Sequence, residues 1–418
     1  MIYKSEFLNV LGSRGYINQC TDLHALDESA YSGKLIGYIG FDCTASSLHV
    51  GSLIQIMMLR RMQQCGHMPV VLLGGATTKI GDPSGKTKER QILEHKQIEE
   101  NKESILKSFK NFINFDVEVI VLDNNEWLSD LNYIDFLDAY GRYFSVNRML
   151  SFDSVKLRLE REAHLSFLEF NYMILQSYDF LKLNELHGCA LQMGGSDQWG
   201  NIVSGVELIR KKTGKEVYGL TSELLVTSSG VKMGKTEKGA VWLNEDMLSS
   251  YDYWQFWRNT SDQDVIKFLK LFTDIELVEI NRLSQLKDKD LNEAKILLAN
   301  ECTKMCRGEE AASLAYKTAS AIFSGNSSDF ESATLHEVYM NASEVFTMPV
   351  HKAFLIVELA SSSSDAKRLI RGGGARINNN VVQYENRLMC QEDFHNGVSM
   401  LSAGKKKYAI LKLVTDEK

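Results

Sequence analysis

The sequence predicts an α/β protein whose first half is built on a parallel sheet. Strand-like apolar runs lie at 33–41, 69–73 and 117–122, and residues 49–64 show the 3.6-residue periodicity of an amphipathic helix. Strand, helix and strand in this order form the βαβ unit of a parallel sheet. Rossmann-like sheets of this kind bind ligands at the carboxyl ends of their strands, so we expect a site at that edge.

The second half of the chain has a different pattern. Residues 248–271 and 291–321 are long helical patterns without strand-like runs, and the last part combines short helices with a strand-rich end. We therefore expect a helical domain followed by a small α+β domain. The predicted boundaries are 1–245 for the α/β domain, 246–323 for the helical domain, 324–347 for a linker and 348–418 for the small domain.

Composition excludes several classes of protein. The chain has 44% apolar and 24% charged residues and only three prolines, which is typical of a globular protein. Its apolar stretches are too short to span a bilayer, and its start lacks the pattern of a signal peptide. The seven cysteines are dispersed and form no CxxC, so we expect reduced thiols, no metal site and a cytoplasmic location.

The charge is distributed unevenly. The chain has a net charge of −7, but residues 348–418 contain eleven Lys+Arg and seven Asp+Glu, which gives +4 there and −11 in the remainder. A basic end on an acidic body favours a local module that binds a polyanion. An uneven surface without a partner is the alternative.

The segment HVGS at 49–52 comes after a predicted strand and opens a predicted helix. A helix N-terminus presents free N–H groups and positive potential, which attract phosphate. His49 could donate to a phosphoryl oxygen there, and the small Gly51 permits close approach of a nucleotide. A helix cap or a packing role is the alternative for the histidine.

Basic residues gather in two polar, glycine-rich segments. KMGKT places Lys232 and Lys235 three residues apart, next to Thr236, where they could hold the charge of a triphosphate. A solvated basic loop is the alternative. The earlier segment GDPSGKT is no P-loop, because Ile80 stands where that motif needs glycine, but its Lys86 and Arg90 could also meet phosphate.

Two further segments suggest a pocket for a small polar ligand. Tyr172, Gln176 and Asp179 follow the spacing i, i+4, i+7 and therefore share one helix face. In QMGGSDQWG, Gly195 permits close approach of a ligand and Asp197 could accept from ribose hydroxyls. A solvent-facing stripe and a plain turn are the alternatives.

Taken together, these segments resemble the class I aminoacyl-tRNA synthetases, and most closely the bacterial-type tyrosyl-tRNA synthetases. HVGS is similar to the HIGH signature and KMGKT to the KMSKS signature, and tyrosyl-type stretches are matched by GYIGFDCTASSLHVGSL, GGATTKIGDPSG, NYMILQSYDFL and QMGGSDQWGNI. The segment SSSSDAKRLIRGGGARINNN near the end resembles an S4-type RNA-binding module. Three positions depart from the pattern: Ser52 replaces the final histidine of HIGH, Cys43 replaces a proline, and Thr78-Lys79 interrupt a glycine-rich stretch.

The resemblance implies a tyrosine–tRNA ligase that works in two steps. ATP is a substrate accompanied by Mg²⁺, no protein-bound metal is expected, and the other partners are L-tyrosine and tRNA(Tyr). The tyrosine carboxylate attacks the α-phosphate of ATP, and the terminal ribose hydroxyl of the tRNA then attacks the acyl carbon. A homodimer is also implied, with the helical domain near the anticodon.

The resemblance also implies roles for individual residues. Tyrosine would be held by Tyr38 and Asp179 at its phenol and by Asp82, Tyr172 and Gln176 at its ammonium group. Phosphate contacts and catalysis are implied for His49, Ser52, Lys86, Arg90, Lys232, Lys235 and Thr236. The ATP and adenylate pocket would be lined by Gly40, Asp42, His49, Gly51, Gln192, Gly195, Asp197, Gln198 and Lys235. The tRNA would be gripped by Lys367, Arg368, Arg371 and Arg376.

Two rival functions remain at this point. The chain could be a non-catalytic RNA-binding relative of the ligase, although the preserved His49, Lys232 and Lys235 favour an enzyme. It could also act on tryptophan, although Tyr38 paired with Asp179 suits a phenol better than an indole.

Overall fold

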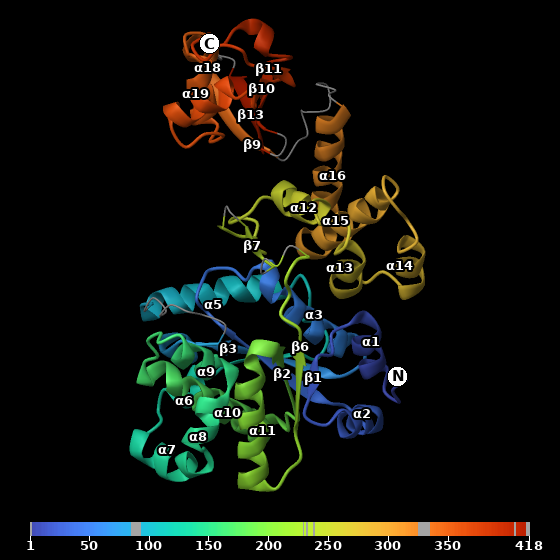
Figure 1. Cartoon of the computed structure of the whole chain (residues 1–418), viewed down its shortest axis with the longest axis vertical. Coiled ribbons are helices and arrows are strands. Elements are labelled where there is room, and N and C mark those ends of the chain that lie inside the picture. Colours follow the sequence, from blue (N-terminus) through green and yellow to red (C-terminus); the bar gives the residue numbers. More distant parts are fainter. Residues whose placement is uncertain are drawn as a thin grey trace. The chain divides into compact units, whose positions relative to one another are not determined.

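The computed structural model describes residues 2–84, 93–228, 230, 233–236, 239–324, 335–404 and 407–414. The chain forms two compact units. Residues 1–248 and 257–306 make up the first unit, and residues 249–256 and 307–418 make up the second. Figure 1 shows the elements of both.

The first unit is built on a six-stranded sheet with the order β1-β6-β5-β2-β3-β4. All neighbouring strands are parallel except β1, which is antiparallel to β6. The strands are β1 (Gln19–Cys20), β2 (Ile36–Asp42), β3 (Met68–Gly74), β4 (Ile120–Asp123), β5 (Leu191–Gly195) and β6 (Tyr218–Ser222). The predicted α/β class with a parallel sheet is therefore confirmed.

Helices connect these strands, and further helices of the unit follow the last strand. The early helices are α1 (Glu6–Arg14), α2 (Leu23–Ser32), α3 (Val50–Gln64), α4 (Thr77–Ile80), α5 (His95–Phe109), α6 (Asn125–Leu128) and α7 (Tyr133–Tyr140). The later ones are α8 (Val146–Ser151), α9 (Asp153–Glu160), α10 (Phe167–His187), α11 (Trp199–Thr213), α13 (Val265–Phe272), α14 (Leu277–Leu283) and α15 (Leu291–Arg307). Figure 1 shows α10 and α11 side by side, and the two helices pack against each other. A short ribbon of β7 (Lys235–Thr236) and β8 (Gly239–Ala240) completes the unit.

The helix α10 carries one wall of the site, and its ends are well defined. Ser166 caps its start by accepting from the backbone N–H of Glu169, whose carboxylate accepts from the backbone of Ser166 in return. The helix ends at Gly188, which has φ of 68°. Its buried face includes Phe180 and Leu183, which pack in the core with Tyr38 from β2.

Each of the two long helical patterns predicted at 248–271 and 291–321 forms two shorter helices. The first pattern forms α12 (Ser250–Arg258) and α13, and the second forms α15 and α16 (Glu309–Ser324), separated at Gly308. Gly308 has φ of 91°, a conformation that ends a helix readily. Most of α13 to α15 belongs to the same compact unit as the sheet.

The second unit contains a five-stranded sheet with the order β11-β10-β12-β13-β9. Its remaining elements are β9 (His336–Asn341), α17 (Ala342–Val345), α18 (Val350–Ile356), α19 (Ser363–Arg371), β10 (Ala375–Ile377), β11 (Asn380–Val381), β12 (Val398–Ala403) and β13 (Lys407–Val414). β9 and α17 fall within the range predicted as a linker. β9 lies at the sheet edge beside β13, and its residues are exposed or only partly buried, so its sequence shows no clear apolar alternation.

Candidate active site

A cavity of about 420 Å³ opens at the carboxyl ends of the central strands of the first unit. β2 and β5 contribute its floor, α10 contributes one wall and the start of α3 contributes another. This is the position at which parallel α/β sheets bind ligands. Most of the described site residues predicted from the sequence line it: Tyr38, Gly40, Asp42, His49, Gly51, Ser52, Asp82, Tyr172, Gln176, Asp179, Gly195, Asp197 and Gln198.

The carboxylate of Asp179 is a buried polar group that lines this cavity. It accepts from the indole Nε1–H of Trp127 at 2.8 Å and from the side-chain amide of Asn124 at 3.0 Å. The hydroxyl of Tyr38 is also buried, and among the described residues it has no hydrogen-bond partner. Buried hydroxyls are usually paired in folded proteins, and Tyr38 lines the cavity, so its hydroxyl is available to a polar group placed there.

Burial perturbs the acidity of both groups. Removal from water raises the pKa of Asp179 to about 7, although the hydrogen bonds from Asn124 and Trp127 oppose this change. The neighbouring charges of Asp42 and Asp123 raise the pKa further. Burial, followed by the charge of Asp179, raises the pKa of Tyr38 well above its ordinary value, so its hydroxyl stays protonated.

A second polar group surrounds Asp42 at the end of β2. The hydroxyl of Tyr172 donates to Asp42 Oδ1 at 3.1 Å, and the hydroxyl of Thr77 donates to the same oxygen at 3.0 Å. Asn124 donates to Thr77 Oγ1 at 2.9 Å and so joins this group to the surroundings of Asp179. The phenol of Tyr172 is therefore held in place before any ligand arrives.

A third group connects the loop at Asp82 with α10. Gln198 Nε2 donates to Asp82 Oδ2 at 2.7 Å, and Asn201 Nδ2 donates to Gln176 Oε1 at 2.9 Å and to Gln198 Oε1 at 3.2 Å. Asp82, Gln176 and Gln198 thus form a row along the cavity, linked by hydrogen bonds to one another and to Asn201. A row of this polarity suits a cationic group such as an ammonium.

The HVGS and KMGKT segments lie against each other. Val50 donates its backbone N–H to Val241 O at 2.9 Å, just beyond KMGKT. A Cβ on Gly234 would come within 2.5 Å of Gly51 N, and the φ of Gly234 is 85°. Only glycine permits this approach without a shift of the backbone. Two segments about 180 residues apart in the chain are thereby brought together.

His49 is oriented by its own helix. It is the residue before α3, and its Nδ1 accepts from the backbone N–H of Gly51 at 2.9 Å. In the neutral imidazole the proton is then on Nε2. His49 therefore caps the helix α3, which was the alternative role considered for it from the sequence. The same hydrogen bond orients its imidazole ring at the cavity wall.

Some predicted residues lie elsewhere or outside the described part of the chain. Gln192 is buried in β5 beside Tyr38 and does not line the cavity. Lys86, Arg90 and Lys232 lie outside the described residues, and of Lys235 and Thr236 only the backbone is described.

The predicted tRNA-binding residues lie in the second unit. Lys367, Arg368 and Arg371 are on α19, and Arg376 is on β10. Arg371 donates to Glu385 at 2.7 Å, and Arg368 donates to the neighbouring Asp365 at 2.8 Å. These arginine side chains remain 84% (Arg368) and 70% (Arg371) exposed, so both are accessible to a partner.

The sequence reading missed several residues that shape the cavity. The cavity is also lined by Asn124, Thr77, Gln55 and Trp242. Trp127 does not line it but holds the carboxylate of Asp179 through a hydrogen bond from its indole. The available signal was position, since Asn124 lies two residues beyond the predicted strand at 117–122, where site residues gather in such sheets.

Within the described part of the chain, no group of three or more His, Cys, Asp or Glu could hold a metal ion. No helix within the same described ranges is long and apolar enough to cross a membrane.

Comparison with known proteins identifies the family. Residues 31–324 match the family model of tRNA synthetases class I (W and Y). The chain is 52% identical over 98% of its length to a tyrosine–tRNA ligase of Methylocella silvestris and over 99% to that of Rickettsia prowazekii, covering 98% and 100% of those proteins. A C-terminally truncated mitochondrial tyrosyl-tRNA synthetase of Aspergillus nidulans superposes with a TM-score of 0.68 and 29% identity, covering 76% of this chain and 94% of that one. The chain therefore belongs to the bacterial-type tyrosyl-tRNA synthetases, within the class I tRNA synthetases.

Proposed function

We propose that the cavity around Asp179 activates L-tyrosine with ATP and then transfers the tyrosyl group to the 3′ end of tRNA(Tyr). The observation that carries this assignment is the buried Tyr38 hydroxyl, which has no partner among the described residues, next to the fixed carboxylate of Asp179. A phenol can accept from Tyr38 and donate to Asp179. Phenylalanine would leave the Tyr38 hydroxyl without a partner and would offer Asp179 no additional donor, which costs free energy in a buried site.

The remaining polar groups would then orient the amino acid. Asp82, Tyr172 and Gln176 would receive the ammonium group, since they present oxygen atoms along one side of the cavity. This would leave the tyrosine carboxylate toward the HVGS segment. The amino acid would be held by its two ends before ATP reacts, which lowers the entropic part of the barrier.

The first step would join the tyrosine carboxylate to the α-phosphorus of ATP. One carboxylate oxygen forms the new P–O bond, and pyrophosphate leaves with the electrons of the broken bond. His49 and Ser52 at the start of α3, together with Lys86, Arg90, Lys232, Lys235 and Thr236, are proposed to contact the phosphates. Mg²⁺ would arrive with ATP as part of the substrate. Stabilisation of the charge that moves onto pyrophosphate is the expected main contribution.

The second step would release AMP. The terminal ribose hydroxyl of the tRNA attacks the acyl carbon, forms the ester and displaces the adenylate phosphate. Gly40, Asp42, Gly195, Asp197 and Gln198 are proposed to hold the adenylate meanwhile. The basic side chains of α19 and β10 are proposed to bind the tRNA backbone. The domain boundaries given above remain proposals of the same kind.

A homodimer and a cytoplasmic location are also proposed. Large apolar side chains are exposed within residues 133–168: Tyr133, Ile134, Val146, Leu150, Leu157, Leu159, Phe167 and Leu168. Ile134 is 70% and Phe167 71% exposed. So many exposed apolar groups within one region support a contact with a second copy. Sedimentation of Ile134→Glu would test this, and a wild-type-like dimer would argue against that surface.

Tyrosine-dependent exchange of pyrophosphate into ATP tests the catalytic proposal. Asp179→Ala should reduce kcat/KM for tyrosine at least about 100-fold and leave the KM for ATP within threefold, because the lost contact is to a charged group in a buried site. Equal losses for both substrates would contradict the assigned role. Absence of exchange by the folded wild-type protein would favour a non-catalytic role, and exchange driven by tryptophan would favour the other branch of the family.

A further inference from the structure

The helix α13 (Val265–Phe272) is anchored by polar contacts at its start. The carboxylate of Asp264, the residue before the helix, accepts from the backbone N–H of Ser228 at 2.9 Å and from the hydroxyl of Ser261 at 2.8 Å. The hydroxyls of Ser228 and Ser261 lie 2.7 Å apart. Ser228 precedes Lys232, the first residue of KMGKT, by four positions. The start of α13 is thus bonded to the chain that leads into KMGKT.

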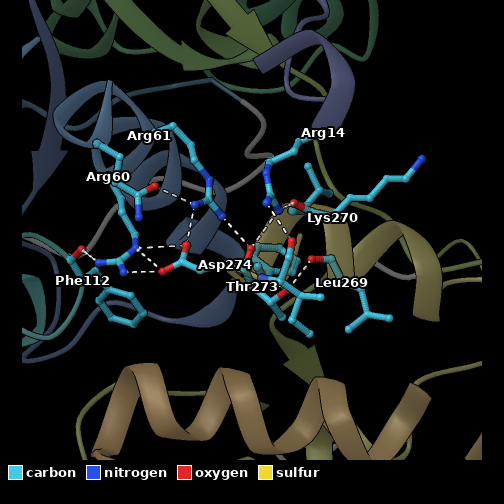
Figure 2. A network of polar contacts seen from close by, with 12 residues as sticks. Arg14, Arg60, Arg61, Phe112, Leu269, Lys270, Thr273 and Asp274 are labelled. Carbon is cyan, nitrogen blue, oxygen red and sulfur yellow. Dashed lines mark hydrogen bonds and ion pairs between the residues drawn. The ribbon is translucent and has the colours of Figure 1, made fainter. Parts of the chain in front are cut away.

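The other end of α13 is anchored to the body of the sheet domain, as Figure 2 shows. Arg14 donates to the carbonyl oxygens of Lys270 at 3.0 Å, Thr273 at 2.9 Å and Ile275 at 2.8 Å. Arg61 donates to Thr273 O at 2.6 Å. Guanidinium groups at a helix C-terminus satisfy the free carbonyls and oppose the negative end of the helix dipole.

Asp274 ties the same end of α13 to the HVGS helix. Its carboxylate pairs with Arg60 and Arg61, which both come from the last part of α3 (Figure 2). The Arg61 side chain is only 3% exposed. The first residue of α3 directly follows His49, so α13 is connected through α3 to the histidine at the cavity wall.

The charges at both ends of α13 are permanent at neutral pH. Burial alone would raise the pKa of Asp274, but Arg60 and Arg61 outweigh it and lower the pKa to about 2. Burial also opposes ionisation of Asp264, yet the hydrogen bonds from Ser228 and Ser261 lower its pKa. Both carboxylates therefore stay charged at neutral pH and keep their partners at the two ends of the helix. An eight-residue helix spans about 12 Å.

We propose that α13 acts as a strut that sets the position of the KMGKT segment relative to the HVGS helix, with Asp264 and Asp274 as positioning residues for adenylate formation. Neither residue lines the cavity, so each acts through the segments to which it is bonded. The inference rests on the proposed contact between KMGKT and the phosphates of ATP. The tyrosine end of the cavity is formed by β2 and α10 and should not respond.

Rapid-quench measurement of adenylate formation tests the strut at its KMGKT end. Asp264→Ala should slow the step about tenfold or more, since a charged acceptor of two hydrogen bonds is lost, while the Kd for tyrosine stays within twofold. Asp264→Asn retains one acceptor oxygen and should recover part of the rate. Asp262→Asn is the matched control, because Asp262 is 65% exposed and pairs with Lys295 instead of Ser228. It should match the wild type.

Two results would overturn the strut. One is an unchanged rate in Asp264→Ala. The other is a loss of tyrosine affinity equal to the loss of rate, which would mean general destabilisation. Asp274→Asn tests the opposite end by the same readouts and should also slow adenylate formation with tyrosine affinity preserved. If it instead unfolds the protein, the Asp264 series decides alone.

Lys235→Ala separates this inference from the proposed function. If Lys235→Ala keeps the full rate of adenylate formation, the proposed role of KMGKT fails and the strut fails with it. If Lys235→Ala is slow and Asp264→Ala is not, only the strut fails. The double variant Asp264→Ala/Lys235→Ala should be no slower than Lys235→Ala alone, because the strut acts through that segment. If the rate losses of the two single variants multiply in the double variant, Asp264 does not act through the KMGKT segment and the strut is contradicted.

Discussion

The indole Nε1–H of Trp127 donates to a carboxylate oxygen of Asp179 at 2.8 Å, although the two residues are 52 positions apart in the chain. The same carboxylate accepts from Asn124 at 3.0 Å. Both donors come from the segment that follows β4, whereas Asp179 belongs to α10. The group proposed to recognise the substrate phenol is therefore oriented by Asn124, which lines the cavity, and by Trp127, which does not.

Trp127→Phe should weaken tyrosine binding without affecting ATP. The substitution keeps most of the aromatic packing but removes the hydrogen bond from the indole to the Asp179 carboxylate. We therefore expect the KM for tyrosine to rise about tenfold. The KM for ATP should stay within twofold in pyrophosphate exchange. A wild-type KM for tyrosine would show that Asn124 alone suffices to hold Asp179.

Tyrosine affinity should depend on pH near neutrality. Burial raises the pKa of Asp179 to about 7 in the free enzyme, so its carboxylate forms as the pH rises through that value. A phenol donates better to the carboxylate than to the neutral acid, so binding below pH 7 must release a proton. We therefore expect the Kd for tyrosine to fall by up to about tenfold per pH unit from pH 5.5 to 7 and then to level off. Calorimetric titrations at several pH values measure this.

The control for the pH profile is Asp179→Asn. This variant has no carboxylate to titrate, so its weaker tyrosine binding should be independent of pH over the same range. A pH dependence that survives in Asp179→Asn would place the titrating group elsewhere.

Gly234→Ala should impair adenylate formation. A Cβ at this position meets Gly51 N at 2.5 Å, whereas a Cβ on Gly230 meets nothing within 4 Å. The φ values are similar, 85° and 79°, so both alanines share the same backbone strain. We expect a loss of more than about tenfold in rate for Gly234→Ala and less than threefold for Gly230→Ala. Equal losses would attribute the effect to strain instead of to the contact with HVGS.

The exposed arginines of α19 should bind tRNA in a salt-dependent manner. The double variant Arg368→Ala/Arg371→Ala should raise the KM for tRNA about tenfold and reduce the salt dependence of binding by a slope of about 1 to 2. Pyrophosphate exchange, which needs no tRNA, should be unchanged. Arg282→Ala is the control for loss of an exposed arginine elsewhere, because Arg282 is exposed in the other unit and pairs with Glu279 and Glu293. An unchanged salt slope would remove these arginines from the tRNA contact.

Much of the α/β core could be predicted because its signals are local. The apolar runs of β2 and β3 are bounded by glycine, and the periodicity of α3 extends over several turns. β5 and β6 are fully buried central strands, yet their sequences, LQMGG and YGLTS, lack such a run. Their strand character depends on neighbours in the sheet, which no local pattern reveals.

The same difference between local signals and topology-dependent contacts applies to the site. Tyr172, Gln176 and Asp179 could be grouped because helical spacing alone places them on one face. The partners of Asp179 could not, because Asn124 and Trp127 reach it only through the order of strands in the sheet. Contacts within one element were thus predictable, and contacts that arise from topology were not.

The selectivity for tyrosine over phenylalanine in Tyr38→Phe tests the central claim most directly. The measurement is kcat/KM for each amino acid in pyrophosphate exchange. Loss of the buried hydroxyl should lower the value for tyrosine about tenfold and leave that for phenylalanine unchanged or raised, since an unpaired polar group is removed. An equal fall for both amino acids, or no fall for tyrosine, would contradict recognition of the phenol by Tyr38 and Asp179.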